Sequence, residues 1–494
     1  MQVRANTSAR RIRVLLDSNI VIAHEARTPD ADSHSRVSDA LIHLLRELGF
    51  GVLVSAGSVA DFASAPPHLR VDRTRTLAKH YIVLKPVEVP AHLRTVFPPG
   101  ELSRNDQADL QVLATFATGV ADWLITQDSK LASRAKKAGV QDVFSAEEAL
   151  DWLASWRAPE LPNAATARIV PPYTINLAAP VFDSLRADYT GFDDWWRSKV
   201  VGEDRHSILI GSERSPEGIA VLKAESDNPF NLGGEVLKIC TFKIEESSQQ
   251  FRLGELLLRA VIDYVTARAI PVIYLTAFPS KKPLTDWLGH FGFTEVATAG
   301  DGEIVFAKYL RPPVGAPVLS PLEHAITYGP RNLQIHRAHV VPIQARYHHR
   351  IFPDSHAQAS LLSNEPCGNA IRKAYLCHAS TRLLQPGDTL LFLQTGDGPS
   401  AVDTIGVVEA TLASSDAAEI VSFVRNRTVY SIEEIQELCR RRELLAVRFR
   451  LDRTLPSVWT AKDLRTAGVM TRSPQSIATV PEKGVLWVRR QLGA

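Results

Sequence analysis

Cysteine is scarce in this chain. Only four cysteines occur among 494 residues, and no two of them form a CxxC pair. Paired cysteines build structural zinc sites and a dense set of cysteines builds a disulfide scaffold, so the composition argues against both. Scattered free thiols fit a reducing compartment, and we expect a cytoplasmic protein. The four residues are Cys240, Cys367, Cys377 and Cys439.

Long apolar runs are also missing. No stretch approaches the roughly 18 apolar residues that a membrane-spanning helix needs, so no membrane partner is expected. Near the N-terminus, Arg10, Arg11 and Arg13 lead into an apolar stretch that Asp17 and Asn19 interrupt, which makes a poor signal peptide. The 45% hydrophobic and 22% charged residues are ordinary for a globular protein and exclude a wholly disordered chain, a collagen and a coiled coil.

The length suggests three domains. Two stretches rich in proline and alanine, WRAPELPNAATARIVPP and RPPVGAPVLSP, lack the apolar periodicity of packed elements and are interpreted as linkers. From residue 312 onward the chain has 21 Lys+Arg against 16 Asp+Glu, which suggests a polyanionic partner. The predicted ranges are a first domain over 1–157, a linker over 158–171, a second domain over 172–311, a linker over 312–334 and a third domain over 335–494.

The first domain alternates strands and helices. Apolar strands are predicted over 12–16, 52–55 and 123–126, with helices over 33–48 and 106–118 between them. This order predicts a parallel sheet with covering helices. Ligands of such sheets bind beyond the carboxyl ends of the strands, where Asp17 and Asp128 follow the first and last of these strands.

Three segments of this domain, LLDSNI, ADLQVLATFA and LITQDSKL, resemble the PIN-domain nucleases in order and separation. The resemblance places the acidic quartet of that family on Asp17, Asp61, Asp109 and Asp128, with Asp106 as a rival for the third position, and makes all four catalytic metal ligands. Carboxylates that share a pocket raise one another's pKa and need a cation. An all-oxygen set selects Mg²⁺ or Mn²⁺, which activates water and stabilises the charge on a phosphodiester.

The second domain contains a predicted strand over 235–244, a turn, a helix over 251–268 and a strand over 271–278. This succession resembles the GCN5-related N-acetyltransferases (GNAT), an α+β fold in which N–H groups at the helix start hold the pyrophosphate of acetyl-CoA. Gly254 matches the central glycine of the turn, and Leu288 stands where many members place a proton-donating tyrosine. Tyr274 and Tyr309 are the alternatives. The matching cofactor-binding residues are Arg252, Leu253, Gly254 and Glu255.

The third domain is rich in predicted strands, over 388–394, 404–409, 444–451 and 485–488. QPGDTLLF followed by GVVE resembles the mainly-β PUA-like barrels of the ASCH and EVE branch, which implies that this domain binds RNA or a nucleobase. Stacking and polar contacts to unpaired bases would come from the barrel mouth, and phosphate contacts from Arg440, Arg441 and Arg442. The predicted nucleic-acid-binding residues are Asn369, Lys373, Tyr375 and His378.

Taken together, these patterns favour a metal-dependent nuclease, expected to be an endoribonuclease, with an acetyl-CoA-binding GNAT-like domain and an RNA-reading barrel. Two alternatives stay open. One is a GNAT acetyltransferase that acts on a protein or an RNA presented by the barrel, and the other is a non-catalytic nucleic-acid-binding scaffold. By analogy with PIN-like toxins, a cognate antitoxin or a regulatory protein is a further partner to consider.

Overall fold

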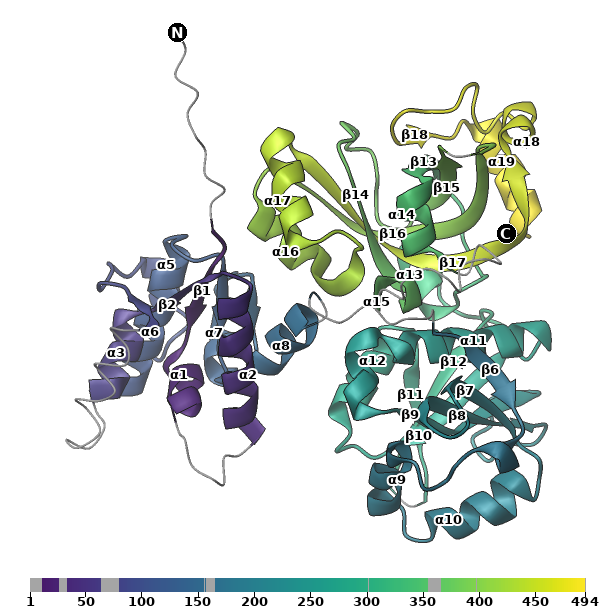
Figure 1. The fold of residues 1–494 in the computed structure, drawn as a ribbon, viewed down its shortest axis with the longest axis horizontal. Coiled ribbons are helices and arrows are strands. Elements are labelled where there is room, and N and C mark those ends of the chain that lie inside the picture. The colour runs from purple at the N-terminus through teal and green to yellow at the C-terminus, as the bar shows by residue number, and fades with distance from the viewer. Residues whose placement is uncertain are drawn as a thin grey trace. The chain divides into compact units, whose positions relative to one another are not determined.

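The computed structural model describes residues 11–25, 33–63, 80–154, 156, 165–300, 302–353, 366–396 and 398–493. The chain forms two compact units, one of residues 1–157 with 414–425 and 431–442, and one of residues 158–413 with 426–430 and 443–494. Three separate sheets organise them, as Figure 1 shows. Within the described residues, no helix is long and apolar enough to cross a membrane.

The first sheet is parallel, as predicted, and has the strand order β3-β2-β1-β4-β5. Leu15 pairs with Leu53 on one side and Leu124 on the other. Strands buried on both faces read as continuous apolar runs, which explains why these segments hardly alternate in polarity. The strands are β1 (Arg13–Leu16), β2 (Gly51–Val54), β3 (Ile82–Val83), β4 (Trp123–Ile125) and β5 (Val143–Phe144).

Helices pack on both faces of this sheet (Figure 1). On one face, Gly57 lets α3 approach α6 closely, because a Cβ at Gly57 would lie 2.4 Å from the carbonyl oxygen of Ala108. This contact fixes the part of α6 that carries Asp109. The helices are α1 (Ser18–Glu25), α2 (Ser33–Glu47), α3 (Ala56–Ala63), α5 (Ala91–Arg94), α6 (Arg104–Ala117), α7 (Ser129–Lys137) and α8 (Ala146–Ala154).

The second sheet has the order β11-β12-β10-β9-β8-β7-β6. Its only parallel pair among the described strands, β9 with β10, is joined over just Val236–Lys238 and Val272–Tyr274. The longer α11 packs Leu257, Val261 and Val265 into the core over this sheet. The strands are β6 (Ala167–Val170), β7 (His206–Gly211), β8 (Pro216–Glu225), β9 (Val236–Ile244), β10 (Val272–Ala277), β11 (Thr294–Thr298) and β12 (Ile304–Tyr309), and the α-helices are α9 (Asp183–Asp188), α10 (Phe192–Trp195), α11 (Leu253–Ala267) and α12 (Lys282–Gly289).

Both predicted linkers contain regular structure. Strand β6 falls within 158–171 and pairs with β7, and α13 (Pro321–Thr327) falls within 312–334. Prolines next to these elements made the segments read as linkers, but Pro321 occupies the first turn of α13, where a proline is tolerated because the N–H it lacks has no partner in a helix.

The third sheet has the order β14-β17-β16-β15-β13-β18 and curls into a half-barrel (Figure 1). We call this sheet with α14, α15, α18 and α19 the half-barrel. The connection from β16 to β17 carries α16 (Ala417–Val424) and α17 (Ile432–Arg441), which belong to the first unit. The other elements are β13 (Ala338–Gln344), α14 (Ala345–Ile351), α15 (Pro366–Asn369), β14 (Arg372–Cys377), β15 (Thr389–Thr395), β16 (Ala401–Ser414), β17 (Leu444–Thr460), α18 (Ala461–Thr466), β18 (Ala478–Thr479) and α19 (Glu482–Leu492).

One strand prediction in this part is wrong. Residues 485–488 lie inside helix α19 rather than in a strand. The buried residues Val485, Val488 and Leu492 are three and four positions apart, which is the spacing of one helix face. Four apolar letters are too short a window to separate a strand from a helix.

Candidate functional site

Asp17 lies directly after β1, and its side chain is buried. Its backbone N–H donates to the carbonyl oxygen of Ile125 at 3.0 Å, which fixes the residue at the carboxyl ends of β1 and β4. The carboxylate accepts hydrogen bonds from Ser18 N (2.7 Å), Asn19 Nδ2 (2.9 Å) and Thr126 Oγ1 (2.7 Å). Donors of this kind favour the charged form and hold the carboxylate in one orientation.

The rival residues Asp106 and Asp109 both lie on α6, and both pair with Arg134 of α7, at 2.5 and 2.8 Å. They differ in electrostatic setting. A hydrogen bond from the N-cap residue Ser103 and then the contact with Arg134 lower the pKa of Asp106. Asp106 is therefore a charged residue of the helix cap, and this setting favours Asp109 as the third acid.

The pKa of Asp109 is raised to about 7. Burial is the largest cause, and the negative charges of Asp17 and Asp128 come next, against the opposing effect of Arg134. Like charges shift one another's pKa only at short range. The structure thus brings three of the four predicted acids into one electrostatic cluster.

Asp128 is the N-cap of α7, where its Oδ1 accepts from the backbone N–H groups of Lys130 (2.6 Å) and Leu131 (3.2 Å). Thr126 connects it to Asp17, since the Thr126 hydroxyl donates to Asp17 and accepts from the Asp128 N–H at 3.0 Å. The fourth acid, Asp61, has its backbone in α3, but its side chain lies outside the described residues.

The chemistry of the donor set fits a hard divalent cation, because the clustered side chains offer carboxylate oxygens alone. Burial and then the charges of Asp17 and Asp128 raise the pKa of Asp109 in spite of Arg134, so a bound cation would favour the charged form of this carboxylate. In the part of the chain that the structure describes, no three His, Cys, Asp or Glu side chains are arranged closely enough to hold a metal ion. The sequence analysis did not identify Arg134. This residue lies one helical turn after Leu131, which ends the segment LITQDSKL.

At the start of α11, the structure revises the reading of the acetyl-CoA turn. Arg252, not Gly254, has the left-handed backbone conformation (φ 55°) that a glycine would adopt most easily. Gly254 lies in the first turn of the helix, and a Cβ there would be 3.6 Å from the ring of Trp287. The place that a tight phosphate turn gives to glycine therefore carries a long cationic side chain.

The carboxylate of Glu255, in the first turn of α11, is bonded to Arg252 and to the half-barrel. Its Oε1 accepts from Arg252, and its Oε2 accepts from the backbone N–H groups of Ile371 (2.7 Å) and Arg372 (3.1 Å) of the half-barrel. Burial raises the pKa of Glu255, but Arg252 and the two N–H groups outweigh it, so the pKa lies below its usual value. Asn369 packs beside it and donates to the carbonyl oxygen of Phe251 at 2.9 Å.

Glu255 and the half-barrel would compete with acetyl-CoA for the start of α11. A helix start attracts one anion through its N–H groups and its dipole, and Glu255 already supplies a negative charge there. The segment 369–372 covers the same place. Of the two candidate proton donors, Tyr274 is buried, and burial together with its hydrogen bond to Glu225 raises its pKa far above that of a useful acid.

Three of the four residues predicted at a barrel mouth lie in the interior. Asn369 is bonded to Phe251, the Lys373 ammonium donates to the carbonyl oxygens of Cys367 and Gly368, and the Tyr375 hydroxyl donates to the carbonyl oxygen of Pro342 at 2.8 Å. His378 is half-buried and lies 3.2 Å from the carbonyl oxygen of Glu443. The structure gives these side chains structural partners and does not gather them on an RNA-facing surface.

The predicted phosphate contacts Arg440 and Arg441 are exposed, and both pair with Glu437 on α17. Arg442 is the C-cap residue of that helix. Exposed cations paired within one helix contribute little to stability and stay available to a partner.

No protein-family model matches the sequence, and no curated protein is similar to it in sequence. Solved structures are similar to parts of the chain. The ASCH protein of Zymomonas mobilis is 12% identical over 31% of this chain and 94% of its own, with a TM-score of 0.24. An N-acetyltransferase of Staphylococcus aureus is 12% identical over 30% of this chain and 99% of its own, and the PaiA N-acetyltransferase of Thermoplasma acidophilum, in complex with coenzyme A, is 13% identical over 29% and 99%, each with a TM-score of 0.24. The structural neighbours of this chain are thus ASCH domains and GNAT acetyltransferases, at low TM-score and partial coverage, and the PIN-like part has no support from these comparisons.

Proposed function

We propose that the first unit hydrolyses RNA with a divalent cation that would draw Asp17, Asp109 and Asp128 together, since the three carboxylates are not close enough to hold an ion as they stand in the described part of the chain. The observation that carries the proposal is the setting of Asp109, whose pKa is raised to about 7 by burial and then by the negative charges of Asp17 and Asp128. A fold gains nothing from collecting like charges at one sheet edge, so such a cluster favours a function that uses them. The carboxyl ends of parallel strands are also where ligands of such sheets bind.

Each residue has a task in this proposal. Ser18, Asn19 and Thr126 hold the Asp17 carboxylate in place before any substrate arrives. Arg134 donates to Oδ2 of Asp109. Among the contacts that the structure describes, Oδ1 of Asp109 is left for a further ligand. When bound, the cation would supply an activated water and stabilise the charge that develops on the phosphodiester.

RNA is the proposed substrate, and the half-barrel is proposed to help to select it. The excess of basic residues from residue 312 onward supports a polyanionic partner. Because Asn369, Lys373 and Tyr375 are buried, contacts to RNA would have to come from other residues of this part. An acetyltransferase reaction is the weaker alternative, because Glu255 places a negative charge in the first turn of the helix that acetyl-CoA would need and bonds that turn to the half-barrel.

The test is Asp17→Asn, which removes one charge and little volume. We expect the variant to lose cleavage of end-labelled single-stranded RNA in Mg²⁺ or Mn²⁺ and to keep the circular dichroism spectrum of the parent. Asp39→Asn is the matched control, since Asp39 is an exposed aspartate on α2 that is not among the charges acting on Asp109. Cleavage by Asp17→Asn at the parental rate, or cleavage by the parent in EDTA, would show that the carboxylates do not do this chemistry.

A further inference from the structure

Charge is unevenly matched where α11 meets the half-barrel. Four arginines contribute to this junction. One lies at the start of α11, one on β14, one in the segment 426–430 and one on β17. Two glutamates, Glu255 of α11 and Glu409 of β16, face them. The arginines are Arg252, Arg372, Arg427 and Arg450, and the electrostatic effects among these six residues are mutual.

Glu409 is fully engaged. Its carboxylate accepts from Arg372 at 2.8 and 3.2 Å and from Arg450 at 2.6 Å. Burial raises the pKa of Glu409, but these two guanidinium groups lower it to about 2. The other terminal nitrogen of Arg450 donates to the carbonyl oxygen of His290 at 2.6 Å. One carboxylate thus serves two arginines here.

Arg427 is different. It is only partly exposed, its Nε is buried without a hydrogen-bond partner, and its guanidinium donates no hydrogen bond to any described residue. Nε of Arg252 is buried and unpaired in the same way, although its terminal nitrogens donate to Glu255 and Asn426. Burial lowers the pKa of Arg427, and the charges of Arg372 and Arg252 lower it further.

A guanidinium that is mostly removed from water and has no acceptor is costly, because it loses its hydration and gains nothing in return. Two positive charges at this junction have no matching carboxylate. His290 does not add a third, since burial and then Arg372, Arg427 and Arg450 lower its pKa. The junction therefore lacks negative charge and hydrogen-bond acceptors beside Arg427.

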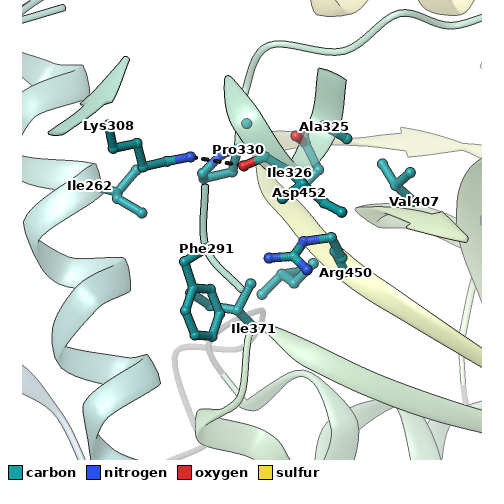
Figure 2. Close-up of a pocket in the computed structure, with 12 residues that line it drawn as sticks. Ile262, Phe291, Lys308, Ala325, Ile326, Pro330, Ile371, Val407, Arg450 and Asp452 are labelled. Carbon is teal, nitrogen blue, oxygen red and sulfur yellow. Dashed lines mark hydrogen bonds between the residues drawn. The ribbon is translucent and has the colours of Figure 1, made fainter. Parts of the chain in front are cut away.

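The small cavity near Arg450 does not provide a ligand site. Figure 2 shows Arg450, Phe291 and Ile371 around it, with Lys308 bonded to the carbonyl oxygen of Ile326. Its volume of about 20 Å³ has room for a water molecule and nothing larger. A ligand for the unmatched arginines has to reach Arg427, which is partly accessible from solvent.

We propose that Arg427 and Arg252 bind a phosphate group at this junction, with Arg372 contributing its charge. A phosphate monoester carries close to two negative charges and three acceptor oxygens, which matches the excess of two positive charges at this junction and the unused N–H donors of Arg427 and of Nε of Arg252. Planar guanidinium forks suit phosphate better than they suit a small halide. The group can come from the end of an RNA strand or from a free phosphate or nucleotide, and it is distinct from the pyrophosphate of acetyl-CoA, which the N–H groups at the start of α11 would bind.

The experiment uses the full chain in a buffer free of phosphate and measures melting temperature and binding heat. Inorganic phosphate should stabilise the parent in a saturable way. Arg427→Gln should weaken phosphate binding about tenfold or more, as the loss of a charge-assisted hydrogen bond implies. Without phosphate, the same variant should be at least as stable as the parent, because it removes an unmatched buried charge, and this rules out misfolding as the cause of lost binding.

Arg472→Gln is the matched control, since Arg472 is an exposed arginine of the same unit, and it should respond to phosphate as the parent does. A 5′-phosphorylated RNA that binds at least tenfold more tightly than both its 5′-hydroxyl form and inorganic phosphate would identify an RNA end as the source. Equal binding of AMP and inorganic phosphate, with no gain from RNA, would identify a free phosphate.

No saturable response of the parent, or an equal response of Arg427→Gln, would overturn the proposal. Coenzyme A that binds more tightly than phosphate and equally well to Arg427→Gln would also overturn it, because the anion would then lie on the helix start. The result does not depend on the nuclease proposal, since Asp17→Asn should bind phosphate like the parent.

Discussion

The like charges around Asp109 lead to a prediction that needs no substrate. Asp109→Asn keeps the size of the side chain and removes its charge, while its amide oxygen can still accept a hydrogen bond from Arg134. Because the pKa of Asp109 is raised from 3.8 to about 7 by burial and by Asp17 and Asp128, we expect the variant to be more stable than the parent above pH 7. The gain should shrink as the pH falls.

The sign follows from proton linkage. Between pH 3.8 and about 7 the folded protein keeps a proton on Asp109 that the unfolded chain has already released, so the free energy of unfolding of the parent falls as pH rises through this window. A rise of about 3 in pKa corresponds to about 4 kcal/mol at most. Asp109 is partly exposed and paired with Arg134, and water screens such charges, so we expect a gain of about 1–2 kcal/mol at pH 8.

Hydrogen exchange of the β1 and β4 amides measures this stability in the first unit alone. The comparison is made in EDTA at about pH 6 and pH 8, after correction for intrinsic exchange, with Asp39→Asn as the control that should not differ from the parent. Adding Mg²⁺ at pH 8 should then stabilise the parent more than Asp109→Asn, because the ion binds the folded state through this carboxylate. If Asp109→Asn loses stability at pH 8, or gains equally at both pH values, the three carboxylates do not repel one another as described.

Two further substitutions test the packing of the second unit. Gly484→Ala should cost about 1–3 kcal/mol in denaturant unfolding, because a Cβ there would lie 2.6 Å from Val480 Cγ1 and 2.7 Å from Val469 Cα, whereas Gly289→Ala, with nothing within 4 Å, should be neutral. Lys308 is buried, and burial lowers its pKa to about 7. Above pH 7 the unfolded chain keeps a proton that the folded state has lost, so the free energy of unfolding of the parent should rise with pH. In a pH series of melting temperatures, Lys308→Met should abolish this rise.

Periodicity alone predicted much of the first sheet. The helix expected over 33–48 is α2 (Ser33–Glu47), and the one expected over 106–118 is α6 (Arg104–Ala117). Asp17 directly follows β1, as expected, because a strand buried on both faces is an apolar run that stops at its first polar residue. Asp128 comes three residues after the end of β4 and caps α7. The sequence pattern could not identify the third acid. Asp106 and Asp109 are one helical turn apart, and only the groups around each side chain in the fold distinguish them.

The half-barrel was harder to predict, for a reason that Lys373 illustrates. A lysine in a strand is usually exposed, yet this one is buried and donates to two carbonyl oxygens at the end of α15. The residue type alone does not reveal whether a polar side chain is buried with its hydrogen bonds satisfied or exposed to solvent. The same holds for Asn369 and Tyr375, whose partners Phe251 and Pro342 are far away along the chain.

The start of α11 favours one negative charge, and in this chain a residue of the helix itself supplies it. Its N–H groups and dipole favour one negative charge, and in this chain that charge belongs to Glu255, which ties the helix to Ile371 and Arg372 of the half-barrel. Glutamate so close to a helix start is common as a stabilising residue and signals nothing by itself. Because Glu255 already brings a negative charge to the first turn of α11, the bonds that join the two sheets work against the binding of acetyl-CoA at this place. The arginines near Glu255 are left with an excess of positive charge, and a phosphate group would therefore bind at Arg427 and not at Gly254.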